Sequence, residues 1–219
     1  VSNNHIFGNI ADDGGGIQSN SSVVIENNII RNNTSRDGAG IRVNSGTYTI
    51  SNNIIMANDA SSKGGGFFCE GGQCEFSKNI VLENEAGSVG GGICVEFGDV
   101  IIQENIIIKN TSSFSGGGMY FSVWLHEYFS TPYPDTANVI GNVISNNISN
   151  GYGAFYFYSE KNESSFSYNF FRDNESTDGT ISSIQIKSFP AFHHNVFSES
   201  LLPIILKNDN AVDTEQFVA

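Results

Sequence analysis

The stretch Ile50–Asn58 reads ISNNIIMAN, and the same pattern returns in Phe76–Asn84 as FSKNIVLEN. Both stretches have the form apolar-x-x-Asn-x-apolar-x-x-Asn, which occurs eight times along the chain. Only the last copy, Phe192–Ser200, lacks the second asparagine. A motif that returns about every 25 residues indicates a solenoid built from repeated coils of the chain. The first asparagines of the eight copies are Asn4, Asn28, Asn53, Asn79, Asn105, Asn142, Asn169 and Asn195.

A cluster of glycines, such as Gly64-Gly65-Gly66, lies between successive copies of this motif. Apolar and polar residues alternate around these clusters, for example in Ile41-x-Val43, with the period of two that is typical of strands. Each repeat therefore contains about three short strands, joined by turns in which Asn or Gly adopts left-handed backbone. The sequence predicts an all-β, right-handed parallel β-helix of about eight rungs, with the first asparagines stacked into an internal ladder.

These repeats resemble those of the right-handed β-helix, or pectin-lyase-like, superfamily. The alternation of Gly-Gly-Gly-apolar with apolar-x-x-Asn is also similar to the repeats of polymorphic outer-membrane proteins, which are surface adhesins. Those proteins usually have Gly-Gly-Ala where this chain has Gly-Gly-Gly. The resemblance covers essentially all of residues 1–219 and implies a single β-helix domain. It implies little about activity, because lyases, hydrolases, adhesins and phage spikes share this architecture.

Composition and charge argue against several classes of protein. The net charge is −13, and the ten Lys and Arg residues form no basic patch, so we expect no nucleic-acid partner. The chain contains no run of 18 apolar residues, so we expect no membrane-spanning helix in this segment. It begins with Val1 rather than Met, and we interpret it as a piece of a longer extracellular or cell-surface protein.

One interval between first asparagines is 37 residues, about ten more than the others. The additional residues lie in Val123–Asp135, which reads VWLHEYFSTPYPD and contains Trp124 and Tyr128. A loop that interrupts a repeat array has no role in the stack, so it is a candidate for function. The same aromatic content also fits a cover that folds back onto the rod, and the sequence leaves both readings open.

The outward positions that follow the glycine clusters bring aromatic side chains to one face, beside the inserted loop. This face is our candidate for binding an extended polysaccharide or a surface protein, since aromatic rings suit both. Glu70 and Glu96 occupy equivalent outward positions one rung apart, so their carboxyl groups are expected about 5 Å apart, as in a retaining glycosidase. Solvated surface glutamates are the simpler interpretation. The candidate binding residues are Phe68, Tyr120, Trp124, Tyr128, Tyr156 and Tyr158.

The sequence contains few of the residues that a polysaccharide lyase or a metal site would need. A polysaccharide lyase needs a cation beside the uronate and a base for its α-proton, and Arg42 is the only arginine on the candidate face. Acidic residues that could bind Ca²⁺ exist, but no loop has a recognisable Ca²⁺ spacing, so we predict no metal site and no cofactor. We favour a non-catalytic adhesin-like or stalk-like module, with a lyase or hydrolase as the alternative.

A second face carries outward apolar residues in three adjacent rungs. A contiguous apolar patch of this kind usually contacts a partner, a neighbouring domain or another copy of the chain. This predicts an interface and gives a further alternative, a purely structural segment that assembles with itself. The interface candidates are Ile54, Met56, Ile80, Leu82, Ile106 and Ile108.

The three cysteines, Cys69, Cys74 and Cys94, leave two alternatives open. A local Cys69–Cys74 disulfide across the turn between them fits an exterior compartment and leaves Cys94 single. Three buried thiols fit the inward pattern equally well.

Overall fold

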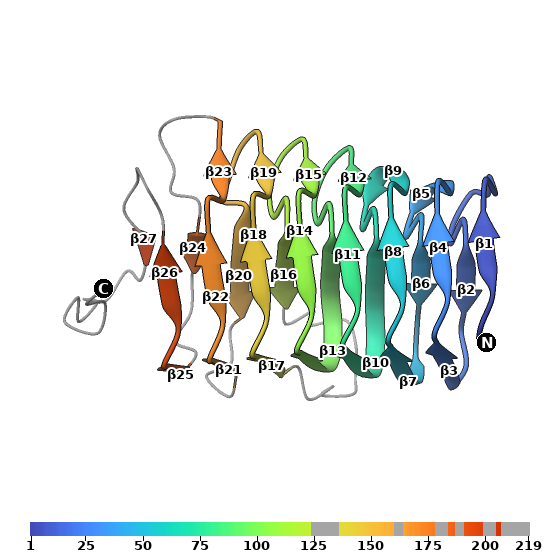
Figure 1. Ribbon diagram of the computed structural model, residues 1–219, viewed down its shortest axis with the longest axis horizontal. Helices are drawn as coiled ribbons and strands as arrows, with labels where there is room; N and C mark the ends of the chain where they lie inside the picture. The colour runs from blue at the N-terminus through green and yellow to red at the C-terminus, as the bar shows by residue number, and fades with distance from the viewer. Residues whose placement is uncertain (124–135, 160–163, 178–183, 187–190, 199–204, 207–219) are drawn as a thin grey trace, which may run out of the picture.

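The computed structural model describes residues 1–123, 136–159, 164–177, 184–186, 191–198 and 205–206. Over these residues the chain is all-β, and it contains no helix long and apolar enough to cross a membrane. In Figure 1 the chain rises along the front, passes over the top and descends along the back, while it advances from the N-terminal end toward the C-terminal end. This path is a right-handed coil, so the predicted parallel β-helix is confirmed.

The front sheet is formed by the three residues that follow the first asparagine of each repeat. Its eight strands follow the order of the chain and are all parallel, so that Ile54, Ile80 and Ile106 are direct neighbours in register. The strands are β1 (His5–Phe7), β4 (Ile29–Arg31), β8 (Ile54–Met56), β11 (Ile80–Leu82), β14 (Ile106–Ile108), β18 (Val143–Ser145), β22 (Phe170–Arg172) and β26 (Val196–Ser198).

The side sheet, at the top of Figure 1, has six strands. The first repeat contributes no strand to this sheet but two isolated bridges, Ile10 with Thr34 and Asp13 with Asp37. The coil therefore completes about six three-sided turns, fewer than the eight rungs predicted from the motif, although every copy of the motif adds a strand to the front sheet. The side strands are β5 (Thr34–Asp37), β9 (Asp59–Lys63), β12 (Glu85–Ala86), β15 (Thr111–Ser112), β19 (Ile148–Ser149) and β23 (Glu175–Ser176).

The back sheet has thirteen strands in two rows, which join because β10 and β13 belong to both. Both strands bend at glycines with positive φ, and a Cβ on Gly72 would lie 2.3 Å from the carbonyl oxygen of Gly46. The first row is β2 (Ile17–Ser19), β6 (Ile41–Val43), β10 (Phe67–Ser77), β13 (Ile93–Gln103), β16 (Met119–Val123), β20 (Phe155–Ser159), β24 (Ile184–Ile186) and β27 (Ile205–Leu206). The second row adds β3 (Val23–Glu26), β7 (Gly46–Ser51), β17 (Ala137–Ile140), β21 (Ser165–Ser167) and β25 (Ala191–His193).

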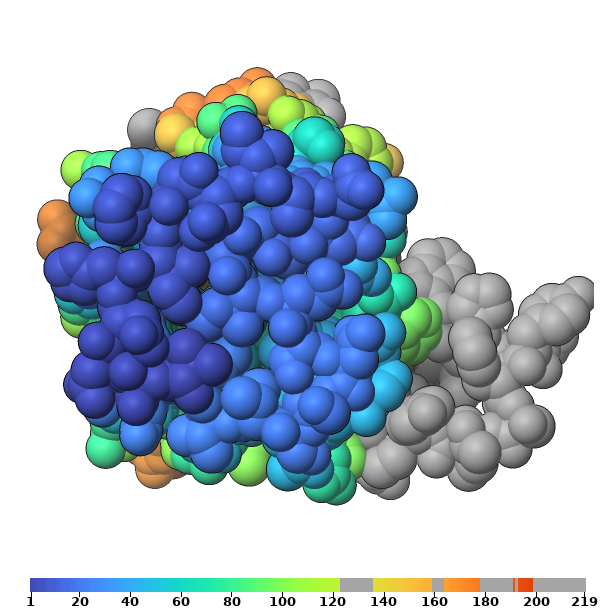
Figure 2. Space-filling view, turned by 90° about the vertical axis from the view of Figure 1, so that its right-hand side faces the viewer, coloured from blue at the N-terminus to red at the C-terminus, as the bar shows by residue number. Residues whose placement is uncertain are grey.

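The core consists of stacked inward side chains from the three sheets. Ile50, Phe76 and Ile102, for example, are neighbours in register and fully buried. Toward the C-terminal end aromatic rings replace the aliphatic ones, and Phe157 packs edge-to-face against Phe166 at 4.8 Å between ring centres. The view from the N-terminal end shows atoms filling the cross-section of the coil (Figure 2). The coil is therefore a packed rod.

The predicted asparagine ladder is confirmed by its hydrogen bonds. The backbone N–H and the carboxamide Nδ2 of Asn53 both donate to Oδ1 of Asn79, at 2.9 and 3.0 Å. The same Nδ2 donates to the backbone carbonyl of Ile25, one turn back, at 2.9 Å. This pattern continues along the stack and satisfies the backbone at the corner where the back sheet meets the front sheet.

A second asparagine ladder, which the sequence analysis did not predict, lies at the other end of the front strands. Asn84 repeats the geometry: its N–H and Nδ2 both donate to Oδ1 of Asn110 at 3.0 Å, and Nδ2 also donates to the carbonyl of Ile55 at 3.0 Å. The second asparagine of the repeat motif thus has the same role as the first. This ladder contains Asn9, Asn33, Asn58, Asn84, Asn110, Asn147 and Asn174.

The three cysteines are free thiols, and all are buried. Of the two alternatives, the buried thiols are confirmed and the local disulfide between Cys69 and Cys74 is absent. Burial raises the pKa of the Cys69 thiol to about 11 and raises the pKa values of Cys74 and Cys94 as well. These thiols act as small apolar side chains of the rod.

Candidate binding surfaces

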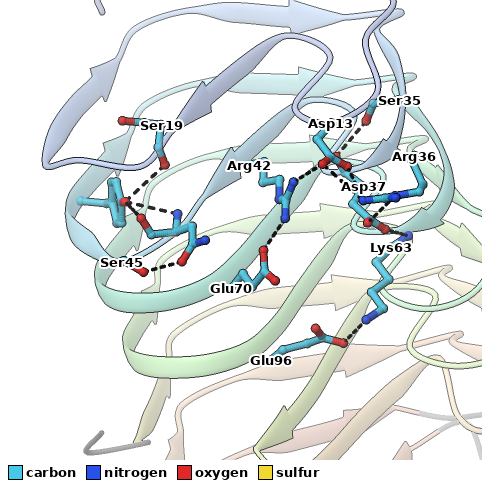
Figure 3. A network of polar contacts seen from close by, with 12 residues as sticks. Asp13, Ser19, Ser35, Arg36, Asp37, Arg42, Ser45, Lys63, Glu70 and Glu96 are labelled. Carbon is cyan, nitrogen blue, oxygen red and sulfur yellow. Dashed lines mark hydrogen bonds and ion pairs between the residues drawn. The ribbon is translucent and has the colours of Figure 1, made fainter. Parts of the chain in front are cut away.

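Ion pairs occupy the N-terminal part of the outer back face (Figure 3). Arg42 on β6 lies between two carboxylates: it pairs with Asp13 at 2.5 Å and also with Glu70 on β10. Burial lowers the pKa of the Arg42 guanidinium, but the hydrogen bond and charge of Glu70, together with Asp13, outweigh this and leave the pKa raised. One rung further on, Lys63 pairs with Glu96 at 2.6 Å.

The two glutamates proposed as a catalytic pair are held in two separate ion pairs. The register between β10 and β13 shifts at this point, so Glu70 lies beside Phe97 and not beside Glu96. The expected equivalence of Glu70 and Glu96 on neighbouring rungs is therefore wrong, because the backbone bends differently at Gly71-Gly72 and at Gly98. Each carboxylate has its own cation, which favours a structural role for both.

Phe68 points outward, as expected, but it is only 2% exposed. It forms a small external core with Val89 and Cys94, against which Tyr120 packs. The guanidinium carbon of Arg42 lies 5.7 Å from the centre of the Phe68 ring, within the range of a cation–π contact. Phe68 is thus covered by its neighbours and is not available to a ligand, contrary to its place among the candidate binding residues.

Tyr120 on β16 and Tyr156 on β20 stack on each other, with ring centres 5.0 Å apart and planes 9° apart. Both rings are half-buried, as is Tyr158 two residues further along β20. Burial, followed by the charges of Tyr120 and Tyr158, raises the pKa of Tyr156 to about 12, so this phenol stays protonated at neutral pH. The other two candidates, Trp124 and Tyr128, lie outside the described residues.

The outer face of the front sheet is the apolar surface that the sequence predicted. Ile80 and Ile106 point outward and are 37% and 40% exposed. No described strand lies in front of their strands, β11 and β14, in Figure 1. Met56, Leu82 and Ile108 form a second, half-buried row beside them. The first row is longer than the three rungs predicted, and in register it reads Ile29, Ile54, Ile80, Ile106, Val143, Phe170 and Val196.

Exposed charges border this apolar face at its two long edges. On one edge Lys78 lies 3.7 Å from Glu104, and on the other Glu83 lies 3.8 Å from Lys109. All four side chains are more than half exposed. These residues directly precede ladder asparagines and have positive φ, which turns the chain into the front strand at Lys78 and Glu104 and out of it at Glu83 and Lys109.

Within the described ranges no three His, Cys, Asp or Glu side chains gather as a metal site. His194 instead stacks on Tyr168, with ring centres 4.9 Å apart. No family model, curated protein or solved structure matches the chain. The two surfaces described above are therefore the basis for a functional proposal.

Proposed function

We propose that this chain is a non-catalytic module of an extracellular or cell-surface protein, which binds an extended glycan along the outer back face. The observation that carries the proposal is the stacked Tyr120–Tyr156 pair, half-exposed on neighbouring rungs with Tyr158 beside it. Aromatic rings contact the apolar faces of sugar rings, and phenol groups donate and accept hydrogen bonds with sugar hydroxyls. A repeat rod displays such residues along a line, which suits a repeating polymer.

Three further points support this reading. The phenol of Tyr156 stays neutral at physiological pH, so it does not repel an acidic polysaccharide. The inserted segment Val123–Asp135 begins at the last residue of β16, the strand that carries Tyr120. The resemblance of the repeats to those of polymorphic outer-membrane adhesins, within the pectin-lyase-like superfamily, points to the same kind of role at the cell surface.

A lyase or hydrolase on the same face is the weaker alternative. It relied on Glu70 and Glu96 as facing carboxyl groups, and each of them is engaged with a different cation. A glycosidase needs one carboxylic acid and one carboxylate on opposite sides of the same bond. The ion pairs therefore favour binding without turnover.

The test is affinity electrophoresis of the chain through gels that contain neutral or acidic polysaccharides, with a parallel assay for new reducing or unsaturated ends. We expect retardation on at least one polymer without turnover, and its loss in Tyr156→Ala. Tyr168→Ala is the matched control, because Tyr168 also belongs to a stacked aromatic pair but lies at the edge of the front sheet. Retardation that Tyr156→Ala leaves unchanged, or turnover of any polymer, would refute the proposal.

A further inference from the structure

One outward row of the front sheet keeps the same type of residue from turn to turn, although exposed positions are usually free to vary. On the outer back face the equivalent position changes along the rod, from Arg42 to Phe68 to Cys94 to Tyr120. On the front sheet it stays isoleucine in four successive rungs and apolar in the next three. Inward packing does not explain this, since Ile80 and Ile106 are exposed. A periodic apolar row on the outside fits a partner that has the same period.

We propose that this partner is a second copy of the chain, bound front sheet to front sheet about a two-fold axis parallel to the rod. Such an axis places each front strand opposite the same strand of the second copy, antiparallel to it. The apolar rows of the two copies therefore match turn by turn along the whole interface. The apolar centre is formed by the residues of β8, β11 and β14. The contact is isologous, which is the commonest arrangement of homodimers.

The charges at the edges of the face support this axis. Each copy has a net charge of −13, so association requires opposite charges to meet locally. One edge carries Lys78 and then Glu104, whereas the other edge carries Glu83 and then Lys109. The two-fold axis exchanges the edges within one rung. Lys78 then meets the Glu83 position of the second copy, and Glu104 meets the Lys109 position.

A two-fold axis perpendicular to the rod is less favourable. It also pairs lysine with glutamate at the edges, but it brings the front strand β4 of one copy against β22 of the other. Arg31 would then face the Arg172 position of the second copy across the interface, because both are the last residues of their strands. With the parallel axis each arginine instead lies opposite an apolar residue of the same rung, Ile29 or Phe170.

The size of the face is sufficient for a dimer. Eight strands about 4.8 Å apart give a length of roughly 38 Å, and five residues across the face give a width of roughly 16 Å. Each copy would then bury on the order of 600 Å², or about 1,200 Å² in total, at the lower limit of stable interfaces. An apolar centre with a charged rim is also the usual composition of such contacts.

Sedimentation velocity over a range from about 1 to 100 μM tests the association, since contacts at the lower limit of interface size are commonly weak ones that such concentrations can populate. We expect the mass to rise from one to two copies, with Ile106→Lys raising the Kd about 100-fold, because each dimer would bury two unpaired ammonium groups. Ile101→Lys is the matched control, because Ile101 is also 40% exposed but lies on the back sheet. Single-copy mass at every concentration, or equal effects of the two variants, would overturn the proposal.

Charge exchange tests the axis. Lys78→Glu should weaken the wild-type dimer, because two glutamates then face each other, and the double variant Lys78→Glu/Glu83→Lys should restore it. About a perpendicular axis these residues would instead face Glu104 and Lys109 positions, so the double variant would be weaker than the single one. Circular dichroism checks that each variant is folded, and a folded double variant without recovery would overturn the parallel axis.

Discussion

The second asparagine ladder should stabilise the rod as strongly as the first, and Asn84→Ala measures this. The Asn84 side chain takes part in four hydrogen bonds: its Nδ2 donates to Asn110 and to the Ile55 carbonyl, and its Oδ1 accepts two from Asn58. Alanine removes all four and leaves the buried backbone N–H of Asn58 without an acceptor. At about 1 kcal/mol for each net hydrogen bond, the free energy of unfolding should fall by about 4 kcal/mol.

Asn79→Ala provides the internal comparison, because Asn79 lies at the opposite end of β11, the same strand. Its side chain also takes part in four hydrogen bonds, with Asn53, Asn105 and the carbonyl of Ile50. The two variants should therefore be equally destabilised. Asn20→Ala, at an exposed asparagine outside both ladders, should change stability by less than about 0.5 kcal/mol.

Urea unfolding followed by circular dichroism gives the free energy of global unfolding, and hydrogen exchange gives the free energy of local opening at each amide. Because repeats contact mainly their neighbours, exchange should increase most at the Asn58 amide and in the rungs around it. A loss below about 1.5 kcal/mol for Asn84→Ala, with the Asn58 amide still protected, would refute the reasoning. It would mean that the carboxamide can be replaced without leaving the buried backbone unsatisfied.

Three further outcomes are expected. Gly66→Ala should destabilise the rod by about 2 kcal/mol or more in urea unfolding, because the new Cβ would lie 2.6 Å from the carbonyl oxygen of Gly92 and 3.0 Å from Nδ2 of Asn84. The protein should lose stability as the pH rises from about 10 toward 12: the pKa of Tyr156 is raised above its unfolded value, so its neutral form stabilises the fold below pH 10. Thermal unfolding of wild type and Tyr156→Phe over this range checks it, and the variant should lose less. Finally, Cys69, Cys74 and Cys94 should react with a thiol reagent only after unfolding, because all three are buried; rapid reaction of the native protein would contradict their placement.

The fold was predictable because the repeat motif follows from the way in which successive turns of the chain stack on each other. An asparagine that recurs in every turn indicates a position with the same hydrogen-bond partners in every turn, and a ladder of inward asparagines is such a position. The second ladder was equally visible in the motif, since Asn58 and Asn84 recur as regularly as Asn53 and Asn79. It was missed because only one asparagine in each repeat was assigned a structural role.

The outward residues were less predictable, for a physical reason. Alternation along a strand gives the direction of a side chain but not what covers it. Phe68 points outward, yet Arg42 and Tyr120 pack around it. Alternation also assumes a constant register, and the local shift between β10 and β13 separates Glu70 from Glu96. The second error arises at the bend of the back sheet, where Gly71-Gly72 and Gly98 allow neighbouring turns to follow different paths.

Repetition itself distinguishes the two outer surfaces. Inward positions repeat because each side chain packs on its equivalent in the next turn, whereas most outward positions are free to differ. The back face follows this expectation, and its residues change from charged to aromatic along the rod. The front face does not, since its first outward row stays isoleucine through β4, β8, β11 and β14. A varied face suits a ligand recognised at one place, such as the Tyr120–Tyr156 pair. A uniform face suits a contact along the whole length of the rod, which a second copy provides.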